Sequence, residues 1–370
     1  MTKIIVDLNT KVISPQQKIW IVHPGRNRSH IDVFEQEGVV FLEFPGLNLR
    51  PAHFSDDGLL RQAIRQAVAI RSNKGLTRDD GSPILASDFP AHAGTDVSVH
   101  LRTVRHLATR MSAGDLVIVP SRGAGGRVIF GEVAGDFFPQ QTLHVPSLPY
   151  AGTPVRRVNW LRSRGKLELP AHLVKFFEKP PAIAEVGRDR FSEAFYNYAY
   201  DAYRTDSSSW LSVNAPKYDG SDFLGAVAPA QLIALAVSLY RAIEQDADIS
   251  SMNYESIVST FYDESALADA KLRFASPGRY DLKDRDARLA RFINGFLALA
   301  LAGSLVACSA AGNTVEVHED GSKTSAASGD LSDMVNLATK APKGVLQKAE
   351  DQAANSKAKL GLTVPAKVRP

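Results

Sequence analysis

The stretch GDLVIVPSRGAGGRVIFGEVAGDF, residues 114–137, constrains the fold of this chain more than any other. Its two halves, Asp115–Pro120 and Arg127–Val133, are rich in Val and Ile, which favour extended strands. The SRGAGG between them has too many glycines to hold a helix. We therefore predict a β-hairpin whose loop is bracketed by Arg122 and Arg127. These arginines either bind a ligand or simply keep the hairpin tip soluble.

Composition limits the class of protein. With 370 residues, 44% hydrophobic and 22% charged, the chain is long enough for two or three ordinary globular domains. The formal net charge is only +3, so any site for an acidic partner must come from local clustering of basic residues. The single cysteine, Cys308, excludes an internal disulfide framework and fits a reducing cytosol. The first residues lack the long apolar core of a signal peptide, which predicts a cytoplasmic location.

Frequent Gly and Pro residues divide the first half of the chain into short segments, as in a β-rich domain with short helices. Apolar residues recur every three or four positions in 57–70 and in 96–111, which predicts an amphipathic helix in each. Runs of Val, Ile, Phe and Trp predict further strands at 18–22, 38–44 and 154–161.

The order of these segments resembles a known family. KIWIVHPGRN (18–27), GDLVIVP (114–120), IFGEV (129–133) and VRRVNWL (155–161) follow one another as in the N-terminal sensor-like domain of Mrr-type restriction endonucleases. More distantly, they are similar to EVE and PUA-like β-barrels. The resemblance covers roughly residues 18–186 and implies a small, bent β-barrel that binds nucleic acid, often with an extruded base in a pocket.

A pocket of that kind needs an aromatic surface for stacking and cations for the flanking phosphates. Trp20, Trp160 and Phe137 are the candidate stacking residues. The candidate cations are Arg26, Arg28, Arg122, Arg127, Arg156, Arg157, Arg162 and Arg164. Adjacent residues of a strand point to opposite faces, so at most one of Arg156 and Arg157 lines a given surface. From these sets we select Trp20, Trp160, Arg26, Arg28, Arg122, Arg127 and Arg157 as the predicted nucleic-acid-binding residues. Phe44 stands where related domains often have a tryptophan.

No catalytic signature accompanies these residues. The sequence contains no G-x-S-x-G, no phosphate loop and no dinucleotide fingerprint. The histidines have no metal-ligand spacing supported by a third ligand, and the acidic residues of an Mrr-type nuclease half are missing. We therefore predict a protein without enzymatic activity, catalytic residues, metal or cofactor.

The second half is predicted to be helical. Residues 188–290 include an aromatic run at 191–204 and an apolar helix at 228–246. The segment Phe292–Val315 has no charged residue over 24 positions, a length that spans a bilayer, so it is either a membrane helix or a buried core helix. Arginines precede it and acids follow it, which would leave its N-terminal side in the cytoplasm. Residues 316–370 are polar and predicted to be mobile.

These observations predict an α+β chain: a bent PUA/EVE-like β-barrel with helices at 1–187, an α-helical domain at 188–290, an apolar helix at 291–315 and a polar tail at 316–370. Two functions follow. In the first, the barrel senses nucleic acid, with a modified base among the candidates, or a nucleotide, as a bacterial restriction-associated or anti-phage defence component. Its C-terminal half would form homo-oligomers or act at the inner membrane, anchored by the single helix. In the second, the chain is a soluble scaffold for a separate nuclease or ATPase.

Overall fold

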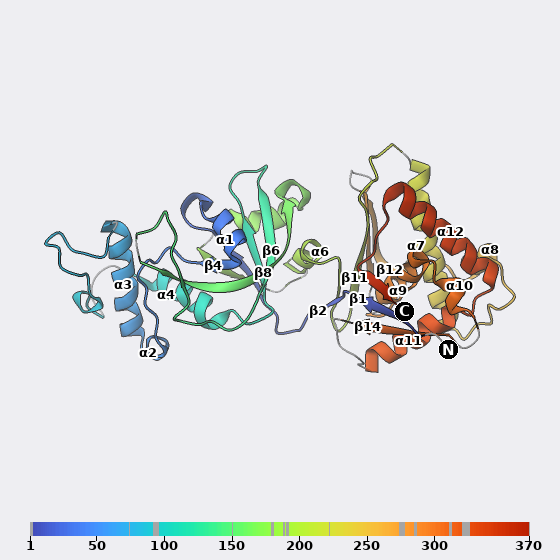
Figure 1. Cartoon of the computed structure of the whole chain (residues 1–370), viewed down its shortest axis with the longest axis horizontal. Coiled ribbons are helices and arrows are strands. Elements are labelled where there is room, and N and C mark those ends of the chain that lie inside the picture. The colour runs from blue at the N-terminus through green and yellow to red at the C-terminus, as the bar shows by residue number, and fades with distance from the viewer. Residues whose placement is uncertain are drawn as a thin grey trace. The chain divides into compact units, whose positions relative to one another are not determined.

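The computed structural model divides into two compact units. Unit 2 comprises residues 16–199, and unit 1 comprises residues 1–15 together with 200–370 (Figure 1). The structure describes residues 3–73, 75–91, 96–149, 151–178, 181–187, 189, 192–221, 223–273, 278–284, 287–310, 313–319 and 326–369. The chain is a mixed α/β protein with curled sheets that include a half-barrel.

The sheet of unit 2 has the strand order β4-β8-β6-β5-β3-β9, with β7 paired to β8. Its strands are β3 (Ile19–Val22), β4 (Val39–Phe41), β5 (Leu116–Pro120), β6 (Arg127–Val133), β7 (Thr142–Leu143), β8 (Thr153–Gly165) and β9 (Ile183–Val186). Strands β3 and β5 pair in parallel, and β5 and β6 form the predicted antiparallel hairpin. Every residue of β3 and β5 is buried, as their continuous apolar sequences require.

Short helices connect and cover this sheet. They are η1 (Arg26–Arg28), α1 (Ile31–Glu37), α2 (Pro51–Ser55), α3 (Asp57–Asn73), η2 (Ala86–Asp88), α4 (Ser98–Arg105), the π-helical turn His106–Arg110, η4 (Lys166–Glu168), α5 (Ala171–Val174), η5 (Lys175–Phe177), η6 (Ser192–Phe195) and α6 (Tyr196–Ala199). Leu60, Ile64 and Ala67 place the buried stripe of α3 at the spacing of one helix face.

One glycine allows the long strand β8 to bend. The register between β6 and β8 shifts between Phe130 and Gly131. A Cβ atom at Gly131 would lie 2.5 Å from both the Trp160 ring and a methyl group of Val158. The bulge therefore needs a residue without a side chain, and the sheet curls there.

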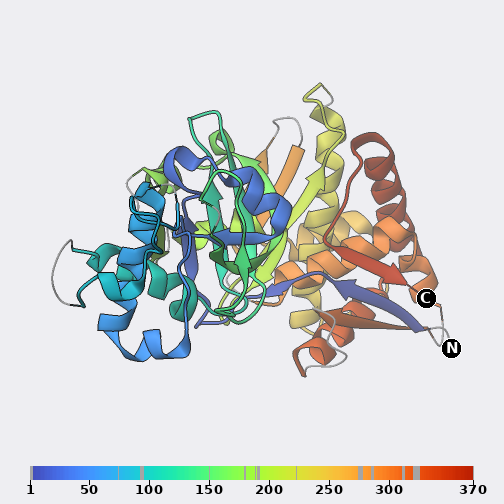
Figure 2. The same ribbon diagram turned by 60° about the vertical axis from the view of Figure 1, so that its left-hand side comes forward.

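Unit 1 contains two further sheets, of order β14-β1-β15 and β12-β13-β11-β10-β2. Their strands are β1 (Lys3–Leu8), β2 (Lys11–Val12), β10 (Ala202–Arg204), β11 (Ser209–Ala215), β12 (Leu267–Arg273), β13 (Gly278–Asp284), β14 (Thr314–Glu319) and β15 (Ala366–Arg369). In Figure 2 the blue N-terminal strand lies beside the red C-terminal strand, as the pairing of β1 with β15 requires. Unit 1 is therefore not the α-helical region that the sequence predicted.

The helices of unit 1 surround a common apolar core. They are α7 (Phe223–Glu244), α8 (Tyr254–Phe261), η7 (Glu264–Ala266), α9 (Leu289–Ala302), α10 (Leu305–Cys308), α11 (Ala326–Ala338) and α12 (Lys343–Leu360). The fully buried rings of Tyr240 and Phe292 meet edge to face at 5.5 Å and join α7 to α9.

The apolar segment 291–315 is not one helix. Helix α9 ends at Gly303, whose φ of 65° stops it after 14 residues, fewer than the about 20 that span a bilayer. Helix α10 follows, and Thr314 already begins β14; residues 311–312 lie outside the described part. The prediction of a single apolar helix was wrong, because the uncharged run 292–315 is divided between α9, α10 and the start of β14. By length and composition alone, one stretch within the described residues could cross a membrane: Val227–Glu244, which is 56% buried.

Two more predictions need correction. The aromatic run 191–204 is not a continuous helix, because α6 ends at Ala199 and β10 begins at Ala202; Phe191 lies outside the described residues. The supposed mobile tail is folded from Ala326 to Arg369. The side-chain amide of Asn336 hydrogen-bonds both backbone groups of Val315, at 2.7 and 2.8 Å, and holds α11 to β14. Leu346, Ala349 and Ala353 bury one face of α12.

Candidate functional site

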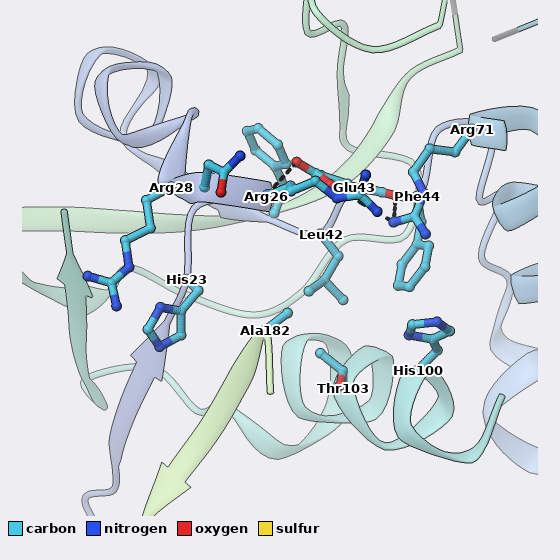
Figure 3. A pocket seen from close by; sticks show the side chains of 13 residues that line it. His23, Arg26, Arg28, Leu42, Glu43, Phe44, Arg71, His100, Thr103 and Ala182 are labelled. Carbon is cyan, nitrogen blue, oxygen red and sulfur yellow. Dashed lines mark hydrogen bonds and ion pairs between the residues drawn. The ribbon is translucent and has the colours of Figure 1, made fainter. Parts of the chain in front are cut away.

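A pocket of about 420 Å³ lies within unit 2 (Figure 3). It is lined by the loop 23–28 after β3, by residues 41–44 at the end of β4, by Arg71 of α3, by His100 and Thr103 of α4, and by Ala182 before β9. The volume falls in the range of small-molecule sites. Its walls combine aromatic rings with several charged and polar groups, as binding pockets do.

The loop after β3 has an unusual backbone. Gly25, Asn27 and Arg28 have φ values of 75°, 56° and 61°, in the left-handed region. A Cβ atom at Gly25 would lie 2.3 Å from the Glu43 carboxylate and from the His30 ring. Glycine is therefore required there, and its lack of a side chain allows Glu43 and His30 to reach the loop. Strained backbone of this kind concentrates at functional sites.

Glu43 is the acidic group of the pocket. Its Oε1 accepts hydrogen bonds from His30 Nε2 at 3.0 Å and from the backbone N–H of Arg26 at 2.9 Å. The hydrogen bond from His30 contributes most to lowering the pKa of Glu43, and the backbone hydrogen bond from Arg26 and the charge of Arg71 lower it further. Burial acts in the opposite direction. Glu43 is therefore an ionised acceptor at neutral pH.

Arg71 and Phe44 form the opposite end of the pocket from His23 and Arg28 (Figure 3). The Arg71 guanidinium lies 5.8 Å from the centroid of the Phe44 ring, and its Nη1 donates to the backbone oxygen of Glu43 at 3.3 Å. The ring of His100 meets Phe44 edge to face at 5.2 Å. The three side chains thus build one cationic and aromatic surface from three separate segments.

Two histidines line the pocket in the neutral form. Burial, with the charges of Arg28 and Lys166, lowers the pKa of His23 to about 4. Burial, with the charge of Arg71, also lowers the pKa of His100. Within the described residues, the buried Nε2 of His23 has no hydrogen-bond partner. An orphaned polar atom at a pocket wall is the kind of group that a bound ligand would satisfy.

Of the predicted arginines, Arg26 and Arg28 line this pocket. Arg26 is exposed, whereas the guanidinium of Arg28 donates to the backbone oxygens of Ser121 and, at 2.7 Å, Phe177. Lys166 donates to Ser121 as well, and to Gly123 at 2.7 Å. Arg28 and Lys166 together therefore hold the hairpin loop in place, and Arg28 has a structural role that the sequence did not predict.

The remaining predicted arginines lie outside the pocket. Arg122 is exposed on the loop that Arg28 and Lys166 hold. Arg127 forms ion pairs with Asp32 at 2.9 Å and Glu35 at 2.7 Å, both on α1. The Arg157 guanidinium is exposed and donates to the Gln141 amide oxygen at 2.7 and 2.9 Å.

The other arginines of β8 either pack into unit 2 or lie at its surface. The Arg156 side chain is buried and donates to the backbone oxygen of Met111 at 3.0 Å. Arg164 lies 3.9 Å from Glu168, and Arg162 is partly exposed. The prediction that Arg156 and Arg157 lie on opposite faces is confirmed by their burial.

The predicted stacking residues are structural. Trp20 is fully buried and its Nε1 donates to Asp115 at 2.8 Å, so its ring has no face on which a base could stack. Trp160 is half-buried and donates to the backbone oxygen of Phe34 at 2.8 Å. Neither tryptophan lines the pocket, and Phe137 packs against the core. The aromatic residues that do line it are Phe41 and Phe44.

Sequence reasoning missed His23, Glu43, Arg71 and His100 as site residues. No local pattern marked them, because they come from separate segments that meet only in the folded unit. Comparisons with protein-family models, with curated proteins and with solved structures found no significant match to this chain. In the part of the chain that the structure describes, no three His, Cys, Asp or Glu side chains are grouped as metal ligands would be.

Proposed function

We propose that unit 2 is a non-catalytic nucleic-acid-binding unit that takes one extruded base, or the base of a free nucleotide, into the pocket beside Phe44. The observation that supports this most is the combination of Arg71, Phe44 and Glu43 at one wall of a pocket of about 420 Å³. Phe44 is buried, so the flat surface offered to a ligand is the partly exposed Arg71 guanidinium that lies over its ring. A fixed acceptor beside it favours a ligand with donor groups at its edge.

Exposed arginines near the pocket also support the proposal. Arg26 at the pocket and Arg122 on the hairpin loop are both exposed, and no hydrogen bond or ion pair to another described side chain engages either guanidinium. Exposed arginines beside a base pocket are placed to contact phosphates on either side of an extruded nucleotide. In a bacterium, such a unit would act as the sensing part of a restriction-associated or anti-phage system, with unit 1 as the responding part.

The full-length chain tests the proposal in a fluorescence-anisotropy titration with labelled duplexes, modified and unmodified, at two salt concentrations. We expect binding that weakens with salt, because each neutralised phosphate releases counterions. Arg26→Ala should weaken binding to every duplex and reduce the salt slope by about 1. Arg110→Ala is the matched control, since Arg110 is an exposed arginine of the same unit outside the pocket. Absence of binding at both salt concentrations would contradict the proposal and favour the scaffold function.

A further inference from the structure

The two oxygens of the Glu43 carboxylate are not equivalent. Oε1 already accepts two hydrogen bonds, from His30 and from the backbone of Arg26. Oε2 lies 3.9 Å from Nη1 of Arg71, beyond hydrogen-bond distance, and no described residue donates a hydrogen bond to it. The first oxygen therefore fixes the carboxylate in place, and the second keeps its capacity to accept.

Among the groups at the Phe44 end of the pocket, Oε2 of Glu43 is the acceptor that stays available to a ligand. The Arg71 guanidinium lies over the Phe44 ring and donates to the backbone of Glu43. His100 packs its ring edge against Phe44. A flat ligand that stacks on the partly exposed Arg71 guanidinium therefore meets the Glu43 side chain, which lines the same pocket, with its edge.

We infer that the pocket selects a base with an amino group at the position of cytosine N4 or adenine N6, and that Glu43 is the residue that determines this specificity. The inference rests on the proposed function. At the position where cytosine carries its N4 amino group and adenine its N6 amino group, guanine and thymine carry the acceptors O6 and O4. A carboxylate only accepts, so at this position it binds the two amino groups and repels the two carbonyl oxygens.

The experiment measures the affinity of the full-length chain for four duplexes that differ at one position. The central base is C, A, G or T, and it faces an abasic site so that no base pair must be broken. Wild-type protein should bind the C and A probes about 10-fold more tightly than the G and T probes. Glu43→Gln should bring the ratio close to 1, because an amide both donates and accepts. Glu37→Gln, an exposed residue on α1, is the matched control and should keep the wild-type ratio.

Each outcome has one meaning. No binding to any probe at low salt would overturn the proposed function. Equal binding of all four probes by the wild type would overturn the specificity and leave the proposed function standing. A ratio that persists in Glu43→Gln would show that another group reads the base. Because the readout is a ratio within one protein sample, partial loss of folded protein lowers all affinities together, and the wild-type ratio tests the specificity even if the variant does not fold.

Discussion

In unit 1, Arg291 of α9 and Glu319 of β14 are only 4% and 3% exposed, and their charged groups meet at 2.9 Å. Arg204 lies near the second oxygen of Glu319, at 3.6 Å. In unit 2, the pocket residue Glu43 has one oxygen fully used, and the buried His23 has a ring nitrogen without a partner among the described residues. Arg291 and Glu319 thus pair with each other, whereas the second oxygen of Glu43 lies beyond hydrogen-bond distance of Arg71 and can accept from a ligand. The difference separates buried charge that stabilises a fold from polar groups available for recognition.

The largest loss of stability is expected from breaking the buried ion pair of Arg291 and Glu319. Arg291→Ala leaves the Glu319 carboxylate buried with a weaker partner, so the free energy of unfolding should fall by about 3–5 kcal/mol. Urea unfolding followed by circular dichroism measures it. Arg288→Ala, which removes an exposed arginine 3.2 Å from Asp330, should cost at most about 1 kcal/mol. Equal losses in the two variants would remove the distinction between buried and exposed pairs.

A smaller effect, which depends on pH, is expected from His23. Its pKa is about 4 in the folded protein and 6.5 in the unfolded chain, so between these values the unfolded state binds more protons. Stability from this group is therefore full above pH 6.5 and falls as the pH drops toward 4, by up to about 3 kcal/mol. His23→Phe should flatten this part of the profile. Urea midpoints at pH 4.5 and 7, in a Trp210→Phe background in which Trp20 and Trp160 of unit 2 report, measure the change. If His23→Phe leaves the difference between the two urea midpoints unchanged, His23 is not buried in its neutral form.

The smallest effect is expected from Trp20. Trp20→Phe removes one hydrogen bond to Asp115, which keeps those from the backbone of Lys18 and Ser112 at 2.9 Å. The lost hydrogen bond and the small cavity left by the smaller ring should together cost about 2 kcal/mol. Affinity for duplexes should stay at the wild-type value, because Trp20 does not line the pocket. Phe44→Leu should lower that affinity in the same titration. Loss of binding in Trp20→Phe with retained stability would place a tryptophan in the site after all.

Local pattern predicted the elements of unit 2 well. The hairpin of β5 and β6, strand β8 and helix α3 all lie where strand propensity and helical periodicity place them. The pocket was harder, because Glu43, Arg71 and His100 come from three segments that only tertiary packing brings together. An arginine in the loop after β3 looks the same in the sequence whether it binds a ligand, as proposed for Arg26, or supports a neighbouring loop, as Arg28 does.

Unit 1 was predicted poorly for a different reason. Burial and membrane insertion select the same apolar residues, so the sequence of α9 to β14 did not distinguish them. Between Leu346 and Leu360, helix α12 buries only the small residues Ala349, Ala353 and Ser356, whose contribution to a core is easily overlooked in a lysine-rich stretch. The pairing of β1 with β14 and β15 joins segments more than 300 residues apart, a separation at which local periodicity carries no information.

Strand β1 also sets an order of events during synthesis. It is the middle strand of its sheet, yet both of its neighbours are made only after the whole of unit 2 has been translated. Residues 3–8 must therefore wait unpaired while unit 2 leaves the ribosome and folds. When residues 366–369 emerge, β15 pairs with β1 and completes this sheet of unit 1. Both ends of the unit 2 segment are then joined to a folded unit 1.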